Sequence, residues 1–331
     1  MSKIMIIAEA GVNHNGDLGI ARQLIDAAWA AGADAVKFQT FRAELLVTPK
    51  AKKAEYQFHN TGTDDSQFEM LKDLELSWED FKILSDYCAF RGIRFLSSPF
   101  DEDSMEYLDS MGMDIIKIPS GEITNYCYLK KAAALKKPVI LSTGMSTPAE
   151  IQDALNLLDQ GRQDITLLHC SSIYPTPMED VNLNAMITMR DTFHKKTGYS
   201  DHTAGIEVAV AAAALGACVI EKHMTLDKTM PGPDHRMSLE PDEFKHMVDS
   251  VRNIEKAMGN GVKAPAGEEL QNRDHVRKFL VAAKDIQKGE PFTIENLCAK
   301  RCSAGISPMK FPQMLGTFAD RDYGKDDKIG E

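Results

Sequence analysis

The sequence lacks several features that assign a protein to a class at once. It has six cysteines but no C-x-x-C pair, and it has no run of lysine or arginine that forms a basic stripe. Acidic residues outnumber basic ones by 49 to 38, which gives a net charge of −11. We therefore expect no nucleic-acid partner, and any anionic ligand must be bound by a few local donors rather than by the overall charge.

Long apolar runs are also missing. The longest, from Val208 to Ile220, is shorter than the about 18 residues that a membrane-spanning helix needs. The first residues turn acidic at Glu9, which is too early for the apolar region of a secretory signal. Several cysteines stand in apolar stretches, where cysteine behaves as a small hydrophobic residue. We expect a cytoplasmic protein in a reducing compartment, with no membrane partner.

What the sequence does contain is a repeated alternation of short β-rich runs with longer helical patterns. Such alternation is typical of βα units and a parallel sheet, and eight units predict a (β/α)₈ TIM barrel. A doubly wound sheet is the alternative, but the turn from Gly11 to Gly16 is not a G-x-G-x-x-G motif. The predicted strands are Ile4–Ala8, Ala35–Thr40, Arg94–Ser97, Ile115–Ile118, Pro138–Ser142, Ile165–His169, Gly198–Ser200 and Val219–His223.

The remaining chain suggests two further segments. A stretch rich in glycine, alanine and proline follows the eighth helical pattern, so we predict a barrel over residues 1–260, a linker over 261–275 and a small β-rich domain over 276–331. The segment from Arg42 to Leu76 is too long for an ordinary βα loop. We interpret it as a lid or loop on the substrate side of the barrel.

Charged and hydroxyl side chains gather at the predicted strand ends, where barrel enzymes place their active sites. Lys37 and Lys117 stand there among several serines, a pattern that favours a cradle for phosphate or carboxylate. The alternative is that each lysine pairs with an internal carboxylate such as Glu9 or Glu122.

Other strand-end residues suggest further chemistry. His202 and His223 close neighbouring strands and either share one divalent ion or are hydrogen-bonded structural histidines. Glu122 either acts as a general base or pairs with Lys117. Asp234 stands in a loop with two prolines, which either presents it to a hydroxyl group of a ligand or merely shapes a turn.

Six short strings occur in order along the chain: IAEAGVNHNG (7–16), VKFQT (36–40), KIPSGE (117–122), LSTGM (141–145), GYSDHT (198–203) and EKH (221–223). Taken together, these strings resemble the sialic acid synthase family, the bacterial nonulosonic acid synthases. The resemblance spans the chain and ends in a segment similar to an antifreeze-like (SAF) domain, from Lys284 to Arg301.

The resemblance implies a transferase that forms a carbon–carbon bond. Phosphoenolpyruvate would condense with the open-chain aldehyde of an N-acetylated hexosamine, either N-acetylmannosamine or 2,4-diacetamido-2,4,6-trideoxymannose, to a nine-carbon nonulosonic acid, with release of phosphate. By resemblance, the residues that bind phosphoenolpyruvate are Lys37, Ser98, Lys117, Ser120, Ser142, Ser172 and Ser200.

The resemblance also implies a metal and a second subunit. His202 and His223 match ligands of Mn²⁺ or Mg²⁺, and Glu122 matches the carboxylate that positions or deprotonates the attacking water. An arginine of the antifreeze-like domain reaches the sugar in the partner subunit's site, which implies a domain-swapped homodimer. The residues that match sugar contacts are Glu9, Gln39, Tyr174, Asp234 and Arg301.

Two alternatives remain at this point. The stretches 118–125 and 53–57 look more like the sialate and legionaminate branches than the pseudaminate branch, and the first two are not separated by sequence. A non-catalytic sugar-binding barrel is the alternative from a different class. The retained Lys37, Glu122, His202 and His223 argue against it.

Overall fold

The structure is a computed structural model that describes residues 3–161 and 164–330. The chain divides into two compact units, with the division after Gly259, and each is considered by itself. The predicted ranges 1–260, 261–275 and 276–331 stay a prediction about domain roles, and their ends at residues 1–2 and 331 lie outside the described residues.

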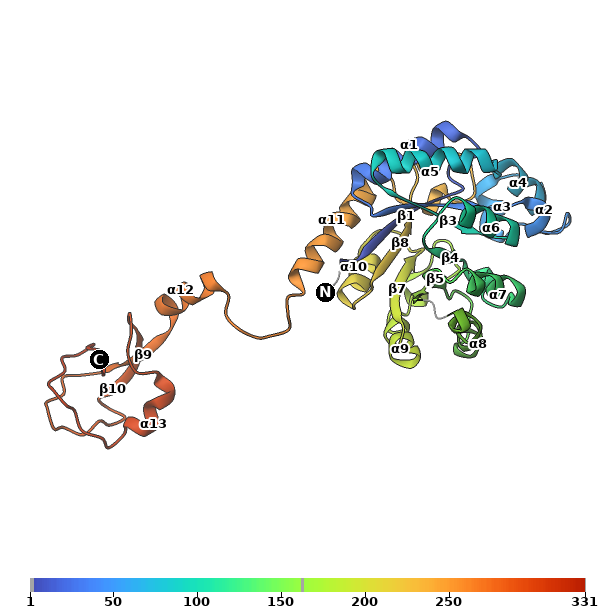
Figure 1. Cartoon of the computed structure of the whole chain (residues 1–331). Coiled ribbons are helices and arrows are strands. Elements are labelled where there is room, and N and C mark those ends of the chain that lie inside the picture. Colours follow the sequence, from blue (N-terminus) through green and yellow to red (C-terminus); the bar gives the residue numbers. More distant parts are fainter. Residues whose placement is uncertain (1–2, 162–163, 331) are drawn as a thin grey trace. The chain divides into compact units, whose positions relative to one another are not determined.

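Eight parallel strands form the sheet of the first unit, and helices surround them (Figure 1). The strand order is β3-β2-β1-β8-β7-β6-β5-β4, and β3 and β4, at the two ends of this order, also contact each other. This nearly closed arrangement confirms the predicted barrel. The strands are β1 (Met5–Gly11), β2 (Ala35–Thr40), β3 (Arg94–Pro99), β4 (Ile116–Ile118), β5 (Val139–Ser142), β6 (Ile165–His169), β7 (Lys196–Asp201) and β8 (Val219–His223).

The helices begin at clear capping signals. Asp17, Ser77 and Thr147 each accept a hydrogen bond from a backbone N–H of the following first turn. Helix α10 begins at Glu207 and not at Gly205, because Gly205 has a left-handed φ of +76°, which is not a helical conformation. The helices between strands are α1 (Leu18–Ala31), α5 (Trp78–Arg91), α6 (Glu102–Ser110), α7 (Tyr126–Ala134), α8 (Pro148–Leu158), α9 (Asn184–Phe193), α10 (Glu207–Ala214) and α11 (Pro241–Ala257).

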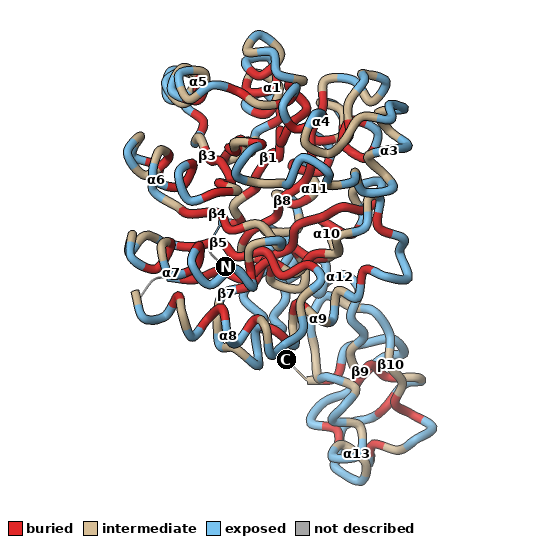
Figure 2. The backbone as a smooth tube through the Cα atoms, turned by 90° about the vertical axis from the view of Figure 1, so that its right-hand side faces the viewer, coloured by how far each residue is buried: buried red, intermediate tan, exposed pale blue. Residues whose placement is uncertain are grey.

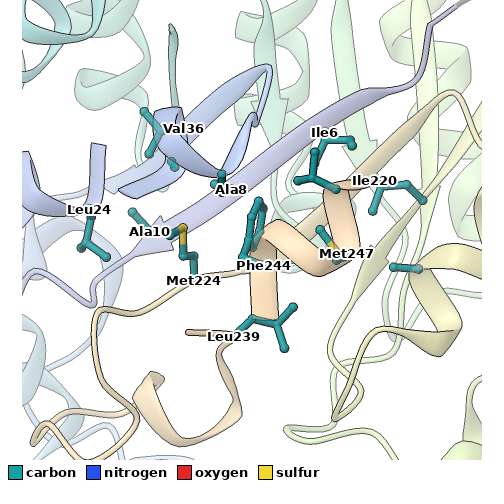
Figure 3. Packing of buried hydrophobic residues seen from close by; sticks show 14 of the residues in the cluster. Ile6, Ala8, Ala10, Leu24, Val36, Ile220, Met224, Leu239, Phe244 and Met247 are labelled. Carbon is teal, nitrogen blue, oxygen red and sulfur yellow. The ribbon is translucent and has the colours of Figure 1, made fainter. Parts of the chain in front are cut away.

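Strand alternation separates the site from the hydrophobic core. On β1, Ile6, Ala8 and Ala10 face outwards, and Figure 3 shows them beside Phe244 and Met247 of α11. Buried residues concentrate on the strands (Figure 2). The alternate residues face the barrel interior, whose lower part is filled by an apolar layer of Ile7, Ala35, Leu96, Ile140, Leu168 and Val219. The next inward positions lie above this layer, and five of these six are polar: Glu9, Lys37, Ser98, Ser142 and Glu221. The sixth, after Leu168, is Cys170.

The long segment after β2 is helical rather than an irregular loop. It forms α2 (Ala43–Leu46), α3 (Glu55–Thr61) and α4 (Gln67–Leu74). Its apolar residues form a separate small core with residues that follow β1 and β2: Val12, Phe41, Ala43, Met70, Leu71 and Leu74. This packing gives the segment a fixed position at one end of the barrel.

The second unit has its own small core around an antiparallel pair of strands. Strands β9 (Lys278–Ala282) and β10 (Leu297–Arg301) pair, and short bridges join later segments to them or to one another. Helix α12 (Gly267–Val276) occupies most of the predicted linker, and its described side chains are exposed. The core residues are Leu280, Ala282, Ile286, Phe292, Leu297, Ala319, Tyr323 and Ile329. Within the described residues, no helix has the length and apolarity needed to cross a membrane.

Candidate active site

Two adjoining cavities of about 490 and 310 Å³ lie at the carboxyl ends of the barrel strands. They share lining residues, among them Gln39, Tyr174 and His223, and so form one continuous site. The cavities bring together all but one of the predicted site residues: Glu9, Lys37, Gln39, Ser98, Lys117, Ser120, Glu122, Ser142, Ser172, Tyr174, Ser200, His202, His223 and Asp234.

Four buried charges occupy the floor of the larger cavity. Lys37 Nζ lies 2.5 Å from Glu9 Oε2 and 3.8 Å from Glu221 Oε1. Lys117 Nζ lies 3.4 Å from the same Glu221 oxygen. Each lysine thus has an internal carboxylate partner, as the alternative prediction stated. The partner of Lys37 is Glu9, as named there, whereas Lys117 pairs with Glu221 and not with Glu122.

Because Lys37 and Lys117 share Glu221, their pKa values shift in opposite directions. Burial by itself would lower the pKa of Lys37, but the carboxylates of Glu221 and Glu9 outweigh it and raise that pKa. Burial dominates at Lys117 and lowers its pKa, because this lysine shares one carboxylate with a second cation. Burial also raises the pKa of Glu9. An anion placed beside Lys117 would therefore supply a counter-charge that the protein itself provides only in part.

Serine hydroxyls complete this floor. Lys37 Nζ donates to Ser98 Oγ at 3.0 Å, and Lys117 Nζ donates to Ser142 Oγ at 2.8 Å. Ser200 Oγ donates to Glu221 at 3.1 Å, and Ser120 Oγ accepts from the backbone N–H of Gly144 at 2.9 Å. The ammonium and hydroxyl groups thus converge on one space, as an anion-binding site requires.

His202 and His223 lie side by side above the floor, with ring centroids 5.5 Å apart. His202 Nδ1 donates to the backbone oxygen of Ser171 at 2.5 Å, which leaves Nε2 as the lone-pair nitrogen. His223 Nδ1 is buried without a hydrogen-bond partner among the described residues. Burial lowers the pKa of both rings, which favours the neutral form that binds metals.

This donor set fits a divalent ion held by two protein ligands. No group of three or more histidine, cysteine or acidic side chains suited to a metal occurs in residues 3–161 and 164–330. The remaining coordination positions would therefore belong to water or substrate, as in open catalytic sites.

Glu122 lies at the wall of the smaller cavity, just after β4. Asn125 Nδ2 donates to Glu122 Oε2 at 2.7 Å and fixes the side chain. Half-burial raises the pKa of this carboxyl above its ordinary value, which moves it towards the range useful for a general base. The predicted alternative, an ion pair with Lys117, is not formed.

The smaller cavity has polar groups at its inner end. Gln39 Nε2 donates to Glu9 Oε1 at 3.1 Å. The ring centroids of Tyr174 and His202 lie 4.4 Å apart. Burial raises the pKa of Asp234 to about 7. Asn60 of the insertion donates to the backbone oxygen of Pro233 at 2.6 Å and so fastens the loop that carries Asp234.

Arg301 lies at the end of β10, exposed, in the second unit. It is the one predicted site residue that does not line the barrel cavities.

Sequence reasoning missed Glu221 as a site residue. Its signal was available, because Glu221 and His223 are two positions apart on one strand and therefore face the same side. Tyr56, Gln57 and Gln67 of the insertion also line both cavities. The segment from Arg42 to Leu76 was expected on the substrate side, but no pattern gave these three residues a role in the site, since only the packing of α3 and α4 brings them to the barrel.

Comparisons with known proteins agree with this geometry. The NeuB family profile matches residues 24–263. The chain is 52% identical to an N,N'-diacetyllegionaminic acid synthase of Campylobacter jejuni over the full length of both, and 47% identical to one of Legionella pneumophila over 94% of this chain and 89% of the relative. The crystal structure of an N-acetylneuraminic acid synthetase from Leptospira borgpetersenii matches with a TM-score of 0.72 at 34% identity, over 83% of this chain and 93% of that one.

The barrel and its strand-end site therefore belong to an enzyme of the NeuB family. The chain is a nonulosonic acid synthase that condenses phosphoenolpyruvate with an acetamido sugar. The family and reaction predicted from the sequence strings are confirmed, and the non-catalytic alternative is wrong.

We predict that Gly144→Ala weakens the use of phosphoenolpyruvate. A Cβ at residue 144 would lie 2.4 Å from Ser172 Oγ and 2.9 Å from Ser120 Oγ, so both hydroxyls must move. Displacement of this size should lower kcat/KM for phosphoenolpyruvate by about 10- to 100-fold, measured by phosphate release. Gly267→Ala, where an added Cβ meets no atom within 4 Å, is the control and should leave kcat/KM unchanged. Equal values for both variants would contradict the prediction.

Proposed function

We propose that the chain is an N,N'-diacetyllegionaminic acid synthase, whose sugar substrate is 2,4-diacetamido-2,4,6-trideoxymannose. The identity of 52% over the full length to a relative of that name carries this choice between the sialate and legionaminate branches.

Phosphoenolpyruvate would bind on the charged floor. Lys117 and Lys37 would face its phosphate and carboxylate, and the hydroxyls of Ser98, Ser142 and Ser200 would hold them by hydrogen bonds. Ser120 and Ser172 line the same cavity beside Gly144. Because the charge of Glu221 is divided between two lysines, the incoming anion would complete the pairing of Lys117.

His202 and His223 would hold Mn²⁺ or Mg²⁺, which, when bound, would supply Lewis-acid polarisation of the aldehyde oxygen. The two rings and Tyr174, packed 4.4 Å from His202, would fix the aldehyde end of the sugar close to the floor. Gln39, Glu9 and Asp234 would bind its hydroxyl groups.

The reaction requires a base that deprotonates the water molecule added to phosphoenolpyruvate. C3 of phosphoenolpyruvate forms a bond to the aldehyde carbon, whose oxygen gains a proton, and water adds to C2. Glu122 would take one proton from this water. Cleavage of the bond from C2 to the phosphate oxygen then releases phosphate, which takes the proton of the new C2 hydroxyl group and leaves the 2-keto acid. The raised pKa of Glu122 suits this role, since a base is most effective when its pKa lies near the working pH.

The second unit would act as an antifreeze-like (SAF) domain. Arg301, exposed at the end of β10, would reach the N-acetyl group of a sugar bound in the partner subunit's barrel. The enzyme would accordingly be a domain-swapped homodimer. Residues 1–260 would be the catalytic domain, 261–275 the linker and 276–331 the antifreeze-like domain.

The proposed sugar is tested by incubating the enzyme with phosphoenolpyruvate, Mn²⁺ and one of several sugars while phosphate release is measured. We expect the highest kcat/KM with 2,4-diacetamido-2,4,6-trideoxymannose and loss of turnover in excess chelator, restored by Mn²⁺ or Mg²⁺. A higher value with N-acetylmannosamine would assign the enzyme to the sialate branch. Full activity in chelator would overturn the metal role of His202 and His223.

Glu122→Gln should lower kcat by roughly 10²- to 10⁴-fold with little change in KM, because the variant keeps the shape of the side chain but not its basicity. Glu106→Gln, at an exposed position on α6, is the matched control. If Glu122→Gln changes KM alone, Glu122 binds substrate and is not the base.

Co-expression of two inactive or weakened variants tests the swapped dimer. Arg301→Ala should raise KM for the sugar, and Glu122→Gln should be nearly inactive. If the domains are swapped, one of the two sites in a mixed dimer is intact. It combines Glu122 of the Arg301→Ala chain with Arg301 of the Glu122→Gln chain, so activity returns to about half of the wild-type value per dimer. No recovery in isolated mixed dimers would show that both residues act within one chain.

A further inference from the structure

Most residues that line the smaller cavity and not the larger one are apolar, and the reaction chemistry leaves this apolar wall unused. It is lined by the insertion and by residues after β1, β2 and β3: Val12, Phe41, Leu46, Val47, Met70, Leu71, Leu74 and Phe100. Most of these side chains also belong to the small core of the insertion. The same cavity also has a polar lining. Glu122 and Asp234 line this cavity and not the larger one, whereas Gln39, Tyr56, Gln57, Gln67, Tyr174 and His223 line both.

The wall is held rigidly from outside. Arg42 Nη1 lies 2.5 Å from Glu75 Oε1, and Glu75 Oε2 accepts from the backbone N–H of Ala43 at 3.1 Å. Lys72 of α4 bonds to Glu44 of α2 at 2.8 Å. These contacts tie α2 to α4 on both sides, so the wall cannot easily rearrange to offer a hydrogen-bonding group to a ligand.

The position of the wall selects which part of the sugar meets it. In the proposed function, on which this inference rests, the aldehyde carbon lies at His202 and His223 in the larger cavity. The open chain then runs past Gln39 and Tyr174, which line both cavities, into the smaller one. The carbon furthest from the aldehyde is the terminal one, and it reaches the apolar end.

We propose that this wall, and Met70 and Val47 in particular, makes the enzyme select sugars whose terminal carbon is a methyl group over sugars that end in a hydroxymethyl group. A methyl group gains from contact with apolar side chains, whereas a hydroxyl group packed against them loses hydrogen bonds to water and finds no partner among the side chains of the wall. An apolar pocket discriminates against an added hydroxyl by about 10- to 100-fold.

The test uses two pairs of sugars that differ only at carbon 6. One pair is 2,4-diacetamido-2,4,6-trideoxymannose and its 6-hydroxy counterpart; the other is N-acetyl-6-deoxymannosamine and N-acetylmannosamine. We expect the wild-type enzyme to have a kcat/KM about 10- to 100-fold higher for the 6-deoxy member of each pair. Equal values within both pairs would overturn the role of the wall, even if the diacetamido sugars are the better substrates.

Three variants connect the preference to the wall. Met70→Gln adds an amide to the wall at nearly constant side-chain length. It should lower the ratio of kcat/KM between the 6-deoxy sugar and its 6-hydroxy counterpart towards one. Val47→Thr keeps the side-chain shape and should reduce the preference less, which preserves the test if Met70→Gln does not fold. Asp73→Asn, exposed on the same helix α4, should keep the wild-type ratio. An unchanged ratio in both wall variants would contradict the proposal.

The two proposals fail in different ways. A 6-deoxy preference within both pairs, combined with better use of the N-acetylmannosamine pair, would support the wall and overturn the legionaminate assignment. Absence of phosphate release with all four sugars would overturn both.

Discussion

The pairing of buried charges at the centre of the barrel is the constraint on which the rest of the site depends. Lys37, Lys117, Glu9 and Glu221 are removed from water, and charges in such a position are tolerated only when they are paired and hydrogen-bonded. Three serines bond directly to this network. Because Glu221 serves two lysines, an anionic substrate bound in the proposed way would supply a further counter-charge to Lys117.

The barrel separates stability from chemistry along each strand. The apolar layer that includes Ile7 and Val219 closes the lower interior, while outward residues such as Ile6 and Ile220 pack against helices. The charged floor of the site is thus a polar layer that rests on packed side chains. The insertion adds a second apolar cluster. Its side chains line the same cavity as Asp234, and they would give the two ends of a bound sugar different surroundings.

Many individual elements were predictable because their signals are local. Strands β2, β6 and β8, for example, have the predicted bounds, since the alternation of side chains along a strand acts over a few neighbours. The helix α12 was not anticipated, because its stretch begins within a glycine- and proline-rich segment. The histidine pair and the strand-end lysines were recognised from their positions, whereas Glu221 was passed over although it shares a face with His223.

By itself, the sequence determined the barrel, the family and the set of groups at the strand ends, since strand periodicity fixes which side chains face inwards. Only the tertiary structure decided which of these groups are partners. It joined Lys117 to Glu221 instead of Glu122, turned Glu122 towards Asn125, and brought Tyr56 and Met70 of the insertion to the cavity. These contacts connect residues far apart in the chain or on different strands, and their distances depend on how the barrel closes and how the insertion packs on it.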